Sequence, residues 1–163
     1  MIVAFDFDNT LMHHSVPPTS WHPMKPQLSI FNALLDRGDS IYIVTARCVT
    51  ISRLGLESAK KKGKTKIVCE GHHHYLKRIF FDMVRKGVIP IMEDFLETYV
   101  PKCDQIKGVY YTDGFPKGEL LKELGVQVLI DDSKHKRAEA LEQGIDAFDP
   151  KDVSQIKHFL KLV

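Results

Sequence analysis

Cysteine is scarce in this chain, with only Cys48, Cys69 and Cys103 among 163 residues. An odd number without a repeated spacing argues against a disulfide framework and favours a reducing, cytoplasmic setting. Long hydrophobic runs are also missing, since no apolar stretch approaches the roughly 20 residues that a membrane-spanning helix needs. The formal net charge is only +2, without a long block of one sign. Composition alone therefore gives no case for a nucleic-acid-binding protein or an acidic tail.

The length of the chain predicts one compact domain covering residues 1–163. A chain of this size buries roughly two-thirds of its unfolded surface, so it needs no disulfide staples. The first five residues have no basic lead and are followed by an acid at position 6, which is too short an apolar run for a signal peptide. We therefore expect a protein that works in the cytoplasm without membrane contact.

Short apolar runs alternate with segments of helical periodicity along the whole chain. This alternation predicts an α/β fold, a Rossmann-like three-layer sandwich with a mostly parallel sheet and no large cap domain. The expected strands are 2–5, 40–45, 66–69, 108–112, 126–130 and an edge strand at 147–148. The expected helices are 27–37, 49–62, 76–84, 92–99, 117–124, 134–143 and 156–163, while 13–26 form a loop or flap. Residues 64–107 form either a small helical insert or an elaborated crossover.

Charged and hydroxyl side chains occur where the predicted strands end. Ligands of open parallel sheets bind outside the carboxyl ends of the strands, so these residues should meet at one edge. Clustered carboxylates repel one another unless a cation neutralises them, and oxygen ligands suit magnesium better than zinc. A phosphoryl group needs such a cation, a lysine and hydrogen-bond donors, and a carboxylate can attack its phosphorus. The residues concerned are Asp6, Asp8, Thr45, Lys117, Asp131 and Asp132.

The run Asp6-Phe7-Asp8-Asn9-Thr10, followed in order by Thr45, Lys117 and Asp131-Asp132, resembles the haloacid dehalogenase (HAD) superfamily. Four ordered motifs make a strong signal, whereas the first motif alone is a moderate one. The resemblance covers nearly the whole chain, and residues 64–107 match least. It implies a phosphatase, because the dehalogenases of the superfamily lack an acid at the position of Asp8. The segments around Lys117 and Asp131 are most similar to nucleotidase-like and polynucleotide-phosphatase-like members.

The resemblance also implies a role for each motif residue. Asp6 is the nucleophile that forms an aspartyl-phosphate, and Asp8 is the general acid and base. The residues implied for substrate binding are Thr45, Ala46, Arg47 and Lys117. Thr45 binds the transferring phosphoryl group, and Lys117 offsets the charge of nucleophile and phosphate. The ligands implied for Mg²⁺ are the side chain of Asp6, the main-chain carbonyl of Asp8, and Asp132 and Asp131. Asp132 is the favoured direct ligand, and Asp131 either acts through water or simply caps the next helix.

Several other residues leave alternatives open. Lys107 and Lys122 are rivals of Lys117 for the role of the cationic residue. The run from Cys69 to His74 is either a zinc site, without an evident fourth ligand, or a surface turn. His13, His14 and Trp21 either touch substrate from the flap or belong to an exposed loop. The lysines at 60, 61, 62, 64 and 66 form either a solvated face or a contact to a phosphate-rich substrate.

The competing functions differ in the order of their motifs and in what covers the site. A receiver domain is disfavoured, because its acid pair precedes its threonine and lysine. A phosphotransferase or phosphomutase needs a cap for its second substrate, which the sequence does not show. A catalytically silent binding protein is disfavoured because no catalytic position is substituted. The expected substrate is a nucleotide or nucleic-acid end, with a phosphoprotein or small metabolite as the alternative.

Overall fold

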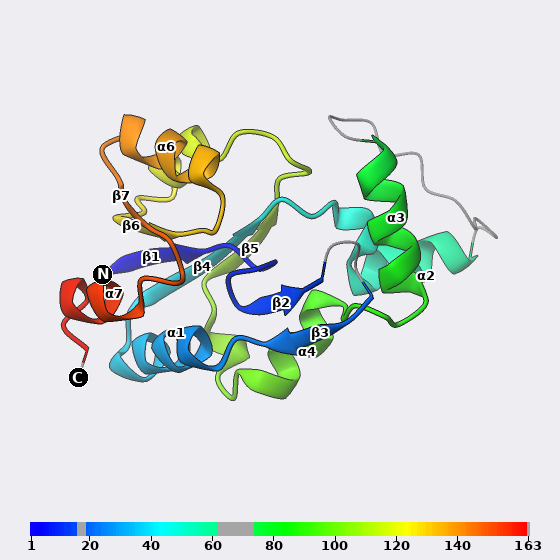
Figure 1. Cartoon of the computed structure of the whole chain (residues 1–163), viewed down its shortest axis with the longest axis horizontal. Coiled ribbons are helices and arrows are strands. Elements are labelled where there is room, and N and C mark those ends of the chain that lie inside the picture. The colour runs from blue at the N-terminus through cyan, green and yellow to red at the C-terminus, as the bar shows by residue number, and fades with distance from the viewer. Residues whose placement is uncertain (16–18, 62–73, 163) are drawn as a thin grey trace.

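The computed structural model describes residues 1–15, 19–61 and 74–162. Its centre is a five-stranded sheet in the order β5-β4-β1-β6-β7, and every neighbouring pair is parallel. Figure 1 shows the first strand in the middle of this sheet. The strands are β1 (Ile2–Phe5), β4 (Ser40–Thr45), β5 (Gly108–Tyr111), β6 (Val128–Ile130) and β7 (Asp146–Phe148). The predicted α/β fold with a parallel sheet is therefore confirmed.

Helices cover both faces of the sheet. Because successive side chains of a strand point to opposite faces, strand β1 contributes to two core clusters. Val3 and Phe5 of β1 belong to one core cluster with α1, α4 and α7, whereas Ala4 belongs to a second cluster with α5 and α6. The result is the predicted three-layer sandwich (Figure 1). The helices are α1 (Lys25–Arg37), α4 (Met92–Tyr99), α5 (Gly118–Glu123), α6 (Lys134–Glu142) and α7 (Val153–Phe159).

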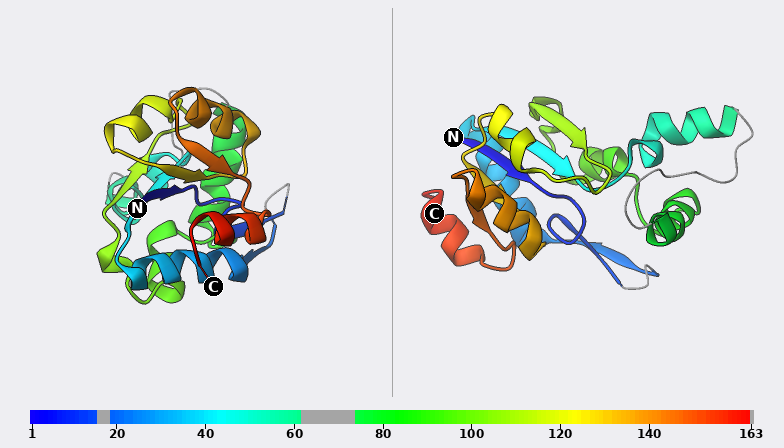
Figure 2. Two further views of the ribbon diagram at one scale, coloured as in Figure 1. Left: turned by 90° about the vertical axis from the view of Figure 1, so that its left-hand side faces the viewer. Right: turned by 90° about the horizontal axis from the view of Figure 1, so that it is seen from above.

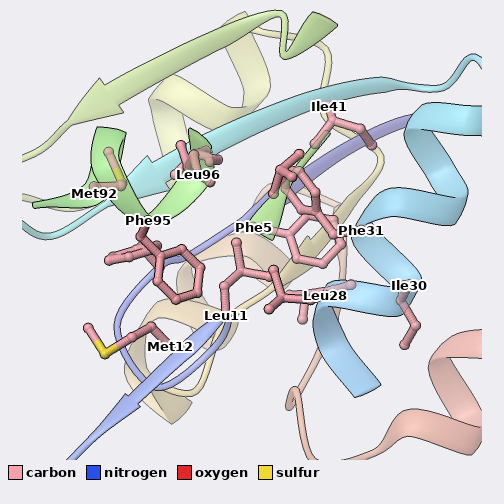
Figure 3. Close-up of a cluster of buried hydrophobic side chains, with 14 of the residues drawn as sticks. Phe5, Leu11, Met12, Leu28, Ile30, Phe31, Ile41, Met92, Phe95 and Leu96 are labelled. Carbon is pink, nitrogen blue, oxygen red and sulfur yellow. The ribbon is translucent and has the colours of Figure 1, made fainter. Parts of the chain in front are cut away.

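Aromatic side chains fill the larger core cluster next to the end of β1 (Figure 3). The ring of Phe5 meets Phe31 of α1 edge-on, with 4.9 Å between ring centroids. Phe7 meets Phe95 of α4 in the same way at 5.1 Å. All four side chains are at most 1% exposed. Phe5 and Phe7 flank Asp6, so their burial in this core fixes the backbone from which Asp6 projects.

Two short strands form a hairpin between β1 and α1. Strand β2 (Met12–His14) pairs antiparallel with β3 (Trp21–Pro23), where the sequence predicts a loop or flap. The Trp21 ring packs against Phe95, at 5.9 Å between ring centroids, so this hairpin is anchored to the core rather than free. Strands of three residues are too short for a recognisable alternation of buried and exposed residues, which explains why the sequence does not reveal them.

The described residues 49–61 and 74–107, between β4 and β5, are largely helical, and we call them the insert. The helix expected at 49–62 is divided at Ser52 into the 3₁₀ helix η1 (Val49–Ile51) and α2 (Arg53–Lys61). Helix α3 (His74–Arg85) follows, and η2 (Cys103–Gln105) lies between α4 and β5. The strand expected at 66–69 lies outside the described residues. Figure 2 shows α2 and α3 beyond the sheet, past the end of β4.

This insert is small, and the described residues contain no large cap domain. Within residues 1–15, 19–61 and 74–162, no helix is both long enough and apolar enough to cross a membrane.

Candidate active site

Three carboxylates come together at the carboxyl ends of two neighbouring strands. Asp6 directly follows β1, and Asp131 and Asp132 directly follow β6, which pairs with β1 up to Phe5 and Ile130. Each of the three acids places a carboxylate oxygen within 4.8 Å of those of the other two. We call these three residues the acid cluster. Its donors are all oxygen atoms, and such a set fits a hard divalent cation like Mg²⁺.

Lys117 lies against this acid cluster and is only 1% exposed. Its ammonium nitrogen Nζ donates to Asp131 Oδ2 at 2.6 Å and to Asp6 Oδ1 at 3.2 Å. Burial alone would lower the pKa of Lys117, but the two carboxylates outweigh it and raise that pKa above its ordinary value. A buried ammonium held between two carboxylates therefore stays charged, which is what a site for a phosphoryl group needs.

The carboxyl group of Asp6 has more negative charge around it than Lys117 alone can neutralise. Burial is the largest cause that raises the pKa of Asp6 well above its ordinary value, and Asp131, Asp8 and Asp132 add to it. Lys117 acts in the opposite direction without cancelling the rise. The pKa of Asp132 is also raised, chiefly because its carboxyl group is partly shielded from water beside the other acids, although the residue as a whole is exposed. A bound divalent cation would supply the missing positive charge and favour the ionised, nucleophilic form of Asp6.

Asp131 and Asp132 have different surroundings. Asp131 is fully buried, and its two oxygens accept from Lys117 Nζ and from the Ser133 backbone N–H at 2.9 Å. Asp132 is exposed and is the member of the pair that faces solvent. Asp132 is thus the member of the pair that is open to a ligand from solvent, while Asp131 holds Lys117. The N-cap of helix α6 is Ser133, whose side chain accepts from the backbone N–H of Lys136.

Helix α6 supports the site through three side chains that sequence reasoning missed. Glu139 Oε2 accepts from the backbone N–H of Lys117 at 2.9 Å. Arg137 donates to the main-chain carbonyl of Asp131 at 2.8 Å. Lys136 Nζ donates to the carbonyl of Phe115 at 3.1 Å, in the loop that precedes Lys117. No local motif marks these contacts, because each depends on how α6 packs beside the sheet.

Asp8 lies two residues beyond Asp6 but in a separate setting. The chain turns after Phe7, whose carbonyl accepts from the backbone N–H of Leu11 at 2.9 Å, and Asn9 takes a left-handed conformation with φ 58°. The carboxylate of Asp8 is 21% exposed and forms a two-point ion pair with Arg47. Arg47 Nε donates to Oδ2 at 2.8 Å, and NH2 donates to Oδ1 at 2.9 Å. His14 Nε2 is 3.8 Å from Oδ1 on the same carboxylate.

The predicted phosphoryl-binding segment follows β4, next to β1 in the sheet. Thr45 is fully buried, and its hydroxyl Oγ1 accepts from the backbone N–H of Arg47 at 3.1 Å. Ala46 is exposed at this strand end. The side chain of Arg47, predicted to bind substrate, contacts Asp8. Thr45 and Ala46 thus lie at the same edge of the sheet as the acid cluster, while Arg47 is committed to a protein carboxylate.

The rival residues lie elsewhere or are engaged differently. Lys107 precedes β5, at the opposite end of that strand, and Lys122 is exposed in the last turn of α5. The exposed ring of His13 lies tilted against that of His22, with 4.9 Å between ring centroids. Trp21 packs against the larger core cluster.

The predicted zinc site and part of the lysine cluster cannot be placed in this description. Residues 62–73 lie outside the described part of the chain, as does the side chain of His74. Lys60 and Lys61 are exposed at the end of α2.

The fold and this geometry define a class: an α/β protein with an acidic, oxygen-donor site and one buried lysine at the carboxyl edge of a parallel sheet. No protein-family model matches this chain, and no curated protein matches it significantly.

Proposed function

We propose that this chain is a magnesium-dependent phosphomonoester hydrolase of the HAD type. The observation that supports this most is Asp6, which projects from the central strand with Lys117 Nζ at 3.2 Å and lies in the acid cluster. A buried carboxylate beside an ammonium group and a cation site has the surroundings that a nucleophile for phosphorus needs. The ordered motifs of the sequence support the same reading.

The reaction would use the two aspartates of the first motif in two steps. In the first, an oxygen of Asp6 attacks phosphorus, the bond to the leaving oxygen breaks, and Asp8 gives that oxygen its proton. In the second, water attacks the phosphorus of the aspartyl-phosphate and gives its proton to Asp8. The bond between Asp6 and phosphorus then breaks and releases inorganic phosphate. Lys117 and the hydroxyl of Thr45 would hold the phosphoryl oxygens.

Mg²⁺ would be held by Asp6, the main-chain carbonyl of Asp8 and Asp132. When bound, it would neutralise charge on the phosphoryl oxygens and on the acid cluster. The raised pKa of Asp6 supports this part of the proposal, because the carboxyl group lacks compensating positive charge.

The proposed substrate is a nucleotide or a nucleic-acid end, and the proposed location is the cytoplasm. The similarity to nucleotidase-like and polynucleotide-phosphatase-like sequences supports the first part. Free thiols at Cys48 and Cys103 suit a reducing compartment and support the second.

A phosphate-release screen tests the proposal. The panel contains nucleoside monophosphates, 3′-phosphorylated oligonucleotides, phosphopeptides and sugar phosphates, each with Mg²⁺ and with EDTA. We expect release from the nucleotide or oligonucleotide groups only with Mg²⁺, and none from the Asp6→Asn variant. Release confined to sugar phosphates or phosphopeptides would contradict the proposed substrate class. No magnesium-dependent release from any member would contradict the phosphatase itself and favour a binding protein.

A further inference from the structure

The side chain of Arg47, next to the proposed phosphate site, is buried and hydrogen-bonded within the protein. Its side chain is only 2% exposed. All three guanidinium nitrogens donate to protein oxygens: Nε and NH2 to Asp8, and NH1 to the carbonyl of Pro90 at 3.0 Å. The guanidinium carbon also lies over the rings of Phe7, at 4.7 Å, and Phe80, at 5.0 Å. A guanidinium held in this way has little freedom to turn toward a substrate phosphate.

The contacts of Arg47 come from two separate parts of the chain. Asp8 and Phe7 belong to the turn after the central strand, whereas Phe80 lies on α3 and Pro90 follows that helix. Figure 2 shows α3 beyond the strand ends. The centre of the Phe80 ring of this helix lies 5.0 Å from the guanidinium carbon of Arg47. Arg47 therefore connects the insert to the carboxylate of Asp8. The aromatic contacts add attraction for the guanidinium and fix its orientation.

We infer that Arg47 is a positioning residue for Asp8. Phe80 and Pro90 of the insert complete the set of contacts that keeps Arg47 in place, and we call Arg47 with these contacts the holder of Asp8. The inference rests on the proposed function and assigns Arg47 a task other than substrate binding. A two-point pair uses one lone pair of each oxygen of Asp8 and fixes the plane of its carboxyl group, so a proton can bind only at the remaining lone pairs. Displacement of a reacting group by about 1 Å can cost on the order of 100-fold in rate, so such a holder has a measurable effect.

A pair of matched arginine variants tests this assignment. Arg47→Lys keeps the charge but cannot form the two-point pair. We expect kcat for p-nitrophenyl phosphate to fall about 10–100-fold, with KM unchanged or lower. The control is Arg53→Lys, since Arg53 is an exposed arginine paired with Asp94 and Glu97, and its kinetics should stay as in the wild type. An unchanged kcat with a raised KM for Arg47→Lys would mean that Arg47 binds substrate, which overturns the inference.

A double-mutant cycle separates a positioning role from an independent one. If Arg47 acts only through Asp8, Arg47→Lys should have almost no further effect in an Asp8→Asn background. A further loss as large as that in the wild type would contradict the inference. Phe80→Leu should lower kcat about 3–10-fold in the same direction. Phe159→Leu is its control, because Phe159 of α7 is exposed and its ring contacts Phe148 of β7 rather than Arg47.

A measurement without substrate keeps the inference separate from the proposed function. In ¹⁵N-resolved spectra of arginine side chains, the Nε–H of Arg47 should exchange slowly, whereas that of Arg53 should exchange fast. Phe80→Leu should speed the exchange at Arg47. A fast-exchanging Arg47 in the wild type would overturn the inference even if no phosphatase activity were found. Slow exchange without any magnesium-dependent release would show that the holder exists and that the proposed function is wrong.

Discussion

Asp6 and Asp8 are two residues apart in the sequence, yet different parts of the molecule determine their surroundings. Asp6 lies with Asp131, Asp132 and Lys117. The two other acids follow strand β6, and Lys117 stands at the start of helix α5, which packs on the sheet. Asp8 faces Arg47, which also contacts Phe80 and Pro90 of the insert. The parallel sheet alone thus builds the acid cluster, whereas the Asp8–Arg47 pair joins two strand ends and is packed against the insert.

This difference indicates a division of labour in the proposed reaction. The sheet would provide the nucleophile and the cation site, which any phosphorylated substrate needs. The insert would fix the proton-transferring group, whose position depends on where the leaving group lies. Changes to the sheet side should therefore affect metal binding and stability together. Changes to the insert side should leave metal binding intact.

The largest expected effect is on the sheet side, where Lys117→Met leaves two buried carboxylates without their cation. We expect the free energy of unfolding in EDTA at neutral pH to fall by about 3–5 kcal/mol. Urea unfolding measures this, with the exposed Lys122→Met as the matched control. Because Mg²⁺ replaces part of the lost charge, its addition should recover some of the stability. An unchanged unfolding midpoint would show that the contact of Lys117 with Asp131 and Asp6 contributes nothing.

The second prediction divides the acid cluster itself. Asp132→Asn should raise the Mg²⁺ concentration for half-maximal phosphate release about 10–100-fold, because it removes the exposed metal ligand. Asp131→Asn should change this requirement less and lower kcat more, since Asp131 holds Lys117 at 2.6 Å. Magnesium titrations of both variants provide the measurement. The reverse ranking would make Asp131 the direct ligand.

The third prediction concerns the insert. A Cβ added at Gly55 would meet the backbone carbonyl of Thr50 at 2.6 Å and come still closer to that of Val49. Gly55→Ala should therefore push α2 away from η1 and cost about 1–2 kcal/mol of stability. Thermal unfolding measures this, with the exposed Ser58→Ala in the same helix as the control. The shift in melting temperature on adding Mg²⁺ should stay as in the wild type, and a lost shift would contradict the separation of the two regions.

The smallest effect is a gain. Because the folded-state pKa of Asp6 is raised, ionised Asp6 opposes folding. The wild type loses this part of its stability as the pH rises from about 4, the unfolded value, through the folded pKa. In EDTA, Asp6→Asn should thus be more stable than the wild type at pH 7 by on the order of 1 kcal/mol, with a smaller gain at pH 4. Calorimetry at both pH values measures this, and an equal or larger gain at pH 4 would contradict the raised pKa.

The sheet side could be predicted from the sequence because its determinants are local. Asp6, Thr45 and Asp131 each follow an apolar run, and parallel strands bring their carboxyl ends to one edge. The insert side could not be predicted in this way. The Arg47 that pairs with Asp8 also packs against Phe80, and no periodicity of α3 shows that this ring lies beside Arg47. The β2–β3 hairpin was missed for another reason, since its strands have only three residues each.

The position of β1 between β4 and β6 has a consequence for how the chain assembles. Strand β1 is made before both of its neighbours: β4 follows it closely, but its other edge stays open until residues near Ile130 have been made. Until then Asp6 lacks both Asp131 and the support that α6 gives to Lys117. Contacts over such sequence separations form late and slowly. A nascent or truncated chain would therefore contain the complete first motif without the acid cluster, and an assembled cluster would report that the chain as far as α6 has folded.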